Sequence, residues 1–220
     1  LKEQKAAPYS HSAAENHCIK YSSFFTVDGA ELQNMEQSVR TGIVGYLGHD
    51  PELFNDSVEN NVLLGDSKNS DTYLNAACMK QEVAEMTDGK NTLIGSGGAY
   101  LSGGQAKRLA FARTLCHDKP ILILDDPFSA LDKNTEKQAF VNLQALAKDS
   151  IVLLISHRLY LFPEMDGVIW MENGKAVTGT HEELLKIVPE YENLYTSQVH
   201  TTENGGAEHD AQKTSENGDL

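Results

Sequence analysis

The chain has 220 residues, and 18 lysine and arginine residues stand against 32 aspartate and glutamate residues, which gives a formal net charge of −14. This charge argues against nucleic acid as the main partner, because binding a phosphate backbone requires clustered basic residues. The longest apolar runs, at 121–124 and 151–155, are far shorter than the roughly 20 residues that cross a bilayer. Three scattered cysteines, Cys18, Cys78 and Cys116, have no metal-ligand spacing and predict reduced thiols in a soluble intracellular protein.

Strand and helix signals alternate along the chain. In the first half they predict a strand at 42–47, a helix capped by Asp56 or Ser57, a broken helical region at 70–86 and a helix after Ser102. Strands at 121–125 and 150–156 follow, separated by a helix at 133–147. The chain continues with a hairpin of 167–171 with 176–178 and with helices that begin at Thr180 and Pro189. The almost wholly aliphatic strand at 150–156 is typical of strands that are buried on both faces. This alternation predicts an α/β fold with a parallel central sheet and an antiparallel edge.

The segment Leu101-Ser102-Gly103-Gly104-Gln105 carries the first chemical signal. Ser102 stands where a helix N-cap belongs, and two glycines follow it. Backbone N–H groups are exposed at a helix N-terminus, where partial positive charge gathers, so phosphate is the natural occupant. An ordinary glycine-rich turn is the alternative interpretation.

Two carboxylates and a histidine follow the two predicted central strands. Asp125 and Asp126 come directly after the run 121–124, and His157 comes shortly after the next strand. Ligands of such sheets bind at the carboxyl ends of the strands. One carboxylate there can hold Mg²⁺ while the other polarises a water molecule. A strand that ends in a turn, and a structural histidine, are the alternatives for each feature taken alone.

These segments together, in this order, resemble the nucleotide-binding domain of ATP-binding cassette (ABC) transporters. Leu101–Gln105 matches the family's signature motif, 121–125 its Walker B strand, 129–132 its D-loop and His157 its switch histidine. The segments at 94–98, 179–185 and 191–195 are similar to exporter-type cassettes. The resemblance implies an α/β, P-loop NTPase-like parallel sheet with a helical signature subdomain.

The resemblance covers about 27–198. It leaves 1–26 as a remnant or poorly ordered segment and 199–220 as an acidic tail with five acidic residues against one lysine, a composition typical of disorder. It implies ATP and Mg²⁺ as cofactors, with Asp125 at the metal and Asp126 and His157 as catalytic residues. Nucleotide contacts are implied for the residues that match the family's motifs: Leu101, Ser102, Gly103, Gly104, Gln105, His49 and Asp132.

Three departures from the family pattern affect the expected activity. No Gly-x-x-x-x-Gly-Lys-Ser/Thr loop occurs, and residues 1–26 contain no glycine, so we expect the phosphate-gripping Walker A start to be truncated or lost. His49 replaces the usual glutamine of the Q-loop. Asp126 stands where a glutamate normally acts as base, and one methylene moves its carboxylate by about an ångström, a misplacement that can cost roughly 10²-fold in rate.

The resemblance therefore predicts an ATPase domain that pairs head to tail with a second cassette and drives export through a transmembrane domain, expected on the same longer polypeptide, at the cytoplasmic face of a membrane. Because the signature is intact and the Walker half is degraded, the chain is expected to complete its partner's site. One alternative is a non-catalytic or truncated cassette that contributes only its signature. Another is a chromosome-maintenance or DNA-repair cassette ATPase, against which the acidic charge and the exporter-like C-terminal segments argue.

Overall fold

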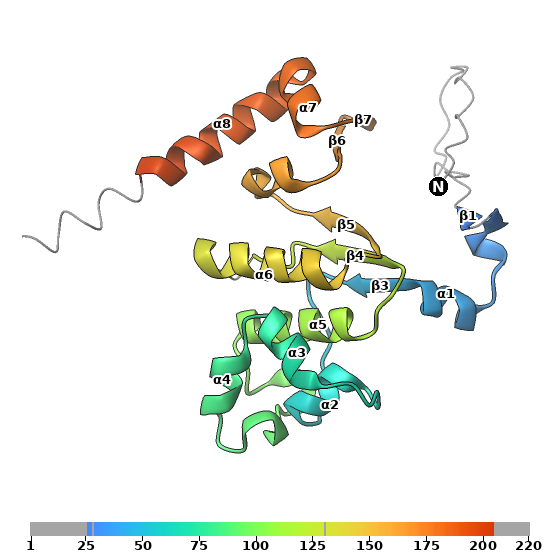
Figure 1. Cartoon of the computed structure of the whole chain (residues 1–220), viewed down its shortest axis with the longest axis vertical. Coiled ribbons are helices and arrows are strands. Elements are labelled where there is room, and N and C mark those ends of the chain that lie inside the picture. The colour runs from blue at the N-terminus through green and yellow to red at the C-terminus, as the bar shows by residue number, and fades with distance from the viewer. Residues whose placement is uncertain (1–25, 28, 130, 205–220) are drawn as a thin grey trace, which may run out of the picture. The chain divides into compact units, whose positions relative to one another are not determined.

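The computed structural model describes residues 26–27, 29–129 and 131–204, and the chain divides into two compact units, one ending at Ile155 and one beginning at Ser156 (Figure 1). The predicted segment 1–26 lies outside the described residues except for Thr26. The predicted tail also lies outside them from residue 205 onward. Helix α8 (Pro189–Asn204) continues past the predicted start of that tail at 199.

The first unit is built on a three-stranded parallel sheet in the order β3-β4-β5, formed by Val44–Leu47, Ile121–Asp125 and Ile151–Ile155. The predicted parallel sheet is therefore confirmed. The first strand is shorter than predicted, because Gly42 belongs to helix α1 (Gln37–Ile43). The N–H of Val44 donates to the carbonyl of Arg40 and closes that helix, so the strand begins only at Val44.

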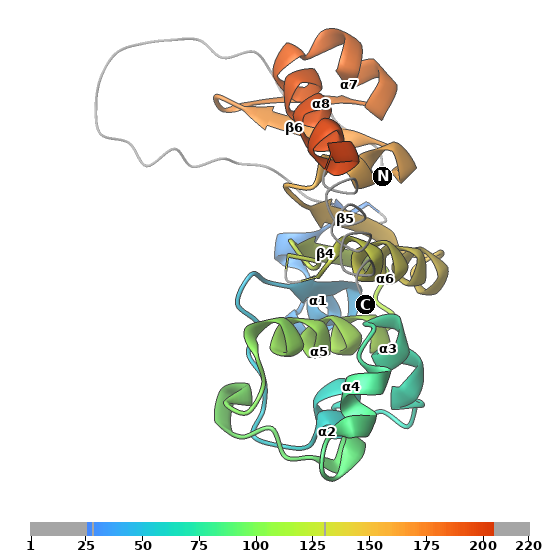
Figure 2. The same cartoon turned by 90° about the vertical axis from the view of Figure 1, so that its left-hand side faces the viewer.

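Helix α5 (Gly103–Cys116) lies between the sheet and a group of short helices, as both views show (Figure 1, Figure 2). Those short helices are α2 (Val58–Leu63), α3 (Ser70–Ala76) and α4 (Lys80–Glu85), so the predicted break within 70–86 is confirmed. Ser57 caps the first of them by accepting a hydrogen bond from the N–H of Asn60. Helix α6 (Lys133–Leu146) follows β4.

Aromatic rings join α5 and α6 through the loop after β4. Phe128 makes edge-to-face contacts with Phe111 of α5 and with Phe140 of α6, at ring-centroid distances of 5.6 and 6.4 Å. All three side chains are buried, as are Leu122 and Leu124 of the central strand. This core fixes both helices against the strand that carries Asp125.

The prediction that the last strand of the sheet is buried on both faces is wrong for the described residues. The side chains of Ile151, Leu153 and Ile155 in β5 are 43%, 44% and 53% exposed. The strand register places Leu153 in one row with Ile123 and Tyr46, on the sheet face opposite Leu124. The described residues therefore bury one face of this sheet and leave the other partly open.

The second unit contains an antiparallel hairpin of β6 (Val168–Glu172) and β7 (Lys175–Gly179). Asn173 and Gly174 both have positive φ, the conformation of the two-residue turn that the sequence predicts here. Helix α7 (His181–Ile187) begins with a capping box of Thr180 and Glu183 and is followed by α8. The hydrophobic core of the second unit consists of Leu159, Val168, Leu184, Val188 and Tyr191.

The remaining elements are short. A two-residue pair of antiparallel strands and four 3₁₀ segments complete the described chain: β1 (Thr26–Val27), β2 (Ala30–Glu31), and segments at Leu32–Asn34, Gly89–Asn91, Ser96–Gly98 and Leu159–Glu164. None of the helices in the described ranges is long and apolar enough to cross a membrane.

Candidate functional site

The segment Leu101–Gln105, the predicted phosphate seat, lies at the N-terminus of α5. Ser102 is the N-cap, as predicted, and its Oγ accepts a hydrogen bond from the N–H of Gln105 at 3.2 Å. In return, Oε1 of Gln105 accepts from the N–H of Ser102 at 2.9 Å, which completes a capping box. Ser102 and Gly103 are exposed, and a Cβ added to Gly103 would meet no heavy atom within 4 Å. The helix terminus is thus capped and open to an approaching anion.

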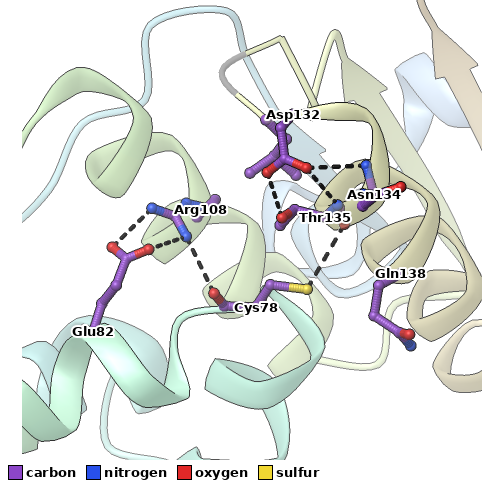
Figure 3. A pocket seen from close by; sticks show the side chains of 8 residues that line it. Cys78, Glu82, Arg108, Asp132, Asn134, Thr135 and Gln138 are labelled. Atoms are coloured by element: carbon purple, nitrogen blue, oxygen red, sulfur yellow. Dashed lines mark hydrogen bonds and ion pairs between the residues drawn. The ribbon is translucent and has the colours of Figure 1, made fainter. Parts of the chain in front are cut away.

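A salt bridge that the sequence did not predict supports this helix terminus (Figure 3). The carboxylate of Glu82 in α4 accepts from both terminal nitrogens of Arg108 in α5, at 2.6 and 2.8 Å. It also accepts from Nε2 of Gln105 at 3.2 Å. Burial alone would raise the pKa of the Glu82 carboxyl, but the hydrogen bonds from Arg108 and Gln105 outweigh it and lower this pKa. Glu82 is therefore held as a carboxylate beside the signature motif.

The predicted carboxylates lie at the carboxyl edge of the sheet. Asp125 ends β4 opposite Ile155, and the next residue, Asp126, has a left-handed backbone with φ of +47°. The N–H of Asp126 donates to the carbonyl of Ile155 at 2.8 Å, which extends the contact between the two strands and fixes this unusual conformation. The exposed His49 follows the neighbouring strand β3 and so belongs to the same edge.

The described residues contain no group of three or more histidine, cysteine, aspartate or glutamate side chains that could hold a metal ion. Mg²⁺ in nucleotide sites commonly uses one or two carboxylates and takes its remaining ligands from phosphate and water. The partly exposed carboxylate of Asp125 fits that requirement. A Mg²⁺ ion bound at this edge would therefore take one or two carboxylates from the protein.

Asp132 has a structural role in α6. One of its carboxylate oxygens accepts from the backbone N–H groups of Asn134 and Thr135 at 3.0 and 3.1 Å, so Asp132 is the N-cap of this helix. Hydrogen bonds from the hydroxyl and the backbone of Thr135 hold the pKa of Asp132 below its usual range. Nearby, the buried Lys107 of α5 donates to Oγ of Ser129 at 3.0 Å. The segment that resembles the D-loop is thereby tied to the signature helix.

His157 belongs to the second unit, where its side chain is exposed. Gln198 of α8 fixes the backbone around it: the Gln198 side-chain nitrogen donates to the carbonyl of His157 at 2.7 Å, and its oxygen accepts from the N–H of Leu159 at 2.9 Å. The sequence carries no local signal for Gln198, which lies 41 residues after His157. This glutamine holds the histidine loop against α8.

The candidate residues of the first unit fall into two clusters, Leu101–Gln105 at the start of α5 and Asp125 with Asp126 at the end of β4. No hydrogen bond or ion pair in the described part of the chain links Ser102 or Gln105 to Asp125 or Asp126. A pocket of about 430 Å³ beside Arg108 includes only one predicted site residue, Asp132 (Figure 3). It is lined by Cys78, Glu82, Arg108, Leu131, Asp132, Asn134, Thr135 and Gln138. The pocket therefore does not unite the two clusters.

Comparisons with known proteins agree with the motif analysis. A family model described as ABC transporter matches residues 16–129. P-glycoprotein 14 of Caenorhabditis elegans is 35% identical over 178 residues, which are 79% of this chain and 13% of that protein. An ATP-dependent lipid A-core flippase of Burkholderia thailandensis is 38% identical over 176 residues, 78% of this chain and 30% of the flippase.

Among solved structures, that of a bacterial Atm1-family ABC exporter with ATP bound superposes with a TM-score of 0.75 and 28% sequence identity. The match covers 81% of this chain and 32% of the exporter chain. The chain spans about a third or less of the length of these relatives.

Proposed function

This chain belongs to the ABC transporter family, and we propose that it is the ATP-binding domain of an exporter, where it takes part in ATP hydrolysis that drives transport across a membrane. The relatives that match it include a flippase and an exporter. In each of these relatives, the part outside the match is more than twice as long as the matched part. We infer that a transmembrane domain belongs to the same assembly and that this domain works at the cytoplasmic face. Transport is thereby favoured over chromosome maintenance or DNA repair.

The observation that carries the proposal is the open, capped N-terminus of α5. Oγ of Ser102 already accepts from Gln105, so its O–H hydrogen remains able to donate to a phosphate oxygen. The N–H groups of Gly103 and Gly104 lie in the first turn of α5, where the helix provides no acceptor for them, and carry the positive end of the helix dipole. Together these donors suit the terminal phosphates of ATP, which supplies the phosphoanhydride bond for hydrolysis.

We infer that this signature serves a nucleotide held by a second cassette, paired head to tail with this one. The separation of the signature cluster from Asp125 and Asp126 within the chain supports that arrangement. At the sheet edge, Asp125 is proposed to hold Mg²⁺ and Asp126 to accept the proton of the attacking water. His157 and His49 are proposed to contact the phosphates and the water network near them.

A narrower second function is favoured by one observation. Asp126 stands where the family resemblance implies a glutamate base, and its side chain is one methylene shorter. A cassette that contributes its signature to a partner, without hydrolysing ATP at its own carboxylates, fits this departure. Asp126→Asn in the assembled transporter separates the two, since the narrower function predicts unchanged ATP hydrolysis.

The test of the proposed function is Ser102→Asp in the assembled transporter. Aspartate is as good an N-cap as serine, so unfolding should change by less than about 0.5 kcal/mol. Its carboxylate, however, would repel the incoming phosphate, and we expect ATP hydrolysis to fall by about 10²-fold or more. Thr180→Asp at the other capping box is the matched control and should hydrolyse ATP normally. Wild-type hydrolysis by the Ser102→Asp variant would refute the proposed role of the signature.

A further inference from the structure

The Glu82–Arg108 pair joins two helices beside the signature. The Arg108 side chain is only 12% exposed and that of Glu82 37% exposed, and two nitrogen–oxygen contacts at 2.6 and 2.8 Å make the pair bidentate. Arg108 also donates to the carbonyl of Cys78 at 3.1 Å, at the junction of α3 and α4 (Figure 3). Arg108 thus fixes the position of the Glu82 carboxylate and is itself held by the backbone at Cys78.

Gln105 stands between this carboxylate and the backbone of Ser102. Its Nε2 donates to Glu82 at 3.2 Å and its Oε1 accepts from the N–H of Ser102 at 2.9 Å. A carboxylate can only accept hydrogen bonds and a backbone N–H can only donate one. If the amide turned over, oxygen would face oxygen at Glu82 and donor would face donor at Ser102. The ionised Glu82 therefore selects one of the two amide orientations.

We propose that Glu82 is a positioning residue for the signature motif: by fixing the orientation of the Gln105 amide, it keeps the capping box closed and the Ser102 hydroxyl aimed outward. This inference rests on the proposed function for its consequence in catalysis. The structural part stands on the contacts of Glu82, Gln105 and Ser102 alone. A displacement of α4, which carries Glu82, would loosen the capping box and weaken the phosphate seat.

An exchange of donor and acceptor tests the inference. Gln105→Glu alone sets two carboxylates against each other, and Glu82→Gln alone removes the charge that orients the amide. In the double variant E82Q/Q105E, the new glutamine can donate to the new glutamate, whose second oxygen accepts from the N–H of Ser102. We expect each single variant to lower hydrolysis by about tenfold and the double variant to recover to within about threefold of wild type.

The structural readout is hydrogen exchange of the Ser102 amide, followed by NMR on the full 220-residue chain. Protection of this amide should fall in both single variants and return in the double variant. Glu85→Gln is the matched control, because it removes a carboxylate from the same helix whose partner is the exposed Gln81, and it should leave Ser102 unchanged.

Losses of Ser102 protection that simply add in the double variant would overturn the inference, because they would mean that Glu82 acts only as a partner of Arg108. Recovery of both protection and hydrolysis in E82Q/Q105E supports it. Recovery of protection, with hydrolysis insensitive to all three variants, supports the positioning role and counts against the proposed function instead.

Discussion

At the scale of single residues, Asp126 combines an unusual backbone with a short side chain. Its left-handed φ of +47° is one that aspartate tolerates better than most residues, and the hydrogen bond to Ile155 holds it there. In the role proposed for Asp126, a carboxylate one methylene further out would reach closer to the attacking water. The structure thus offers a direct way to ask whether geometry limits hydrolysis at this edge.

We expect Asp126→Glu to raise the rate of phosphate release from the assembled transporter by up to about 10²-fold, because it corrects a displacement of about an ångström. Asp126→Asn keeps the shape but cannot accept the proton, so it should abolish whatever hydrolysis this edge supports. An Asp126→Glu variant no faster than wild type would show that carboxylate reach does not limit the reaction, and would favour the signature-only function.

His181 gives the second unit a pH dependence. The ring is buried, and its Nδ1 lies 2.7 Å from the hydroxyl of Tyr191, whose own pKa is raised to about 12 by burial. Burial lowers the pKa of His181 from the usual 6.5, although Glu182 opposes this shift. The folded state therefore binds fewer protons than the unfolded state near pH 6, so stability rises with pH in this range.

The free energy of unfolding of the second unit should consequently be greatest above pH 7 and fall as the pH decreases towards 5. Trp170 lies against Tyr191 with ring centroids 5.6 Å apart, so urea titrations followed by its fluorescence report on this unit. His181→Gln, which cannot titrate, should flatten the dependence. A profile that is equally steep in that variant would assign the effect to another group.

At the scale of elements, β5 presents a strand of large aliphatic side chains that the described residues cover incompletely. Leu153 is 44% exposed, whereas Leu124 in the neighbouring strand is fully buried on the opposite face. Truncating a buried leucine costs about 2–5 kcal/mol, because a cavity is added to the lost transfer free energy. A leucine that stays half exposed loses much less.

Leu153→Ala is therefore expected to cost less than about 1.5 kcal/mol in urea unfolding followed by far-UV circular dichroism, and Leu124→Ala about 2–5 kcal/mol. Equal losses in the two variants would contradict this expectation, because they would mean that the Leu153 side chain is buried in solution.

The elements show which features local sequence determines. The N-caps at Ser102 and Thr180 and the Asn173-Gly174 turn were predictable, because they depend on residues that are close together in the sequence. The exposure of β5 was not predictable. An aliphatic sequence indicates that a strand is buried, but it does not show which residues cover the strand. The start of β3 was missed because helix α1 uses the N–H of Val44.

The candidate site divides in the same way. Ser102, Asp125 and Asp126 follow from motif order and spacing. Glu82 and Gln198 support the site through contacts that span 23 and 41 residues, and only the fold brings such partners together. The local sequence around Glu82 and around Gln198 does not differ from that of an ordinary exposed helix face.

At the scale of the whole molecule, the division after Ile155 implies two cores that can lose structure separately. The first unit contains most of the helical residues, whereas Trp170, the only tryptophan of the chain, belongs to the second. Its ring packs on the core that includes Leu184 and Tyr191. Fluorescence and far-UV circular dichroism therefore weight the two units differently.

Leu184→Ala, which removes a fully buried side chain from the second core, should destabilise that unit by about 2–5 kcal/mol. If the units unfold separately, the fluorescence transition in urea shifts to lower concentration while most of the circular dichroism transition stays in place. Leu124→Ala should show the reverse pattern, because its side chain lies in the core of the first unit. Coincident shifts of both probes in both variants would show instead that the two cores unfold as one cooperative body.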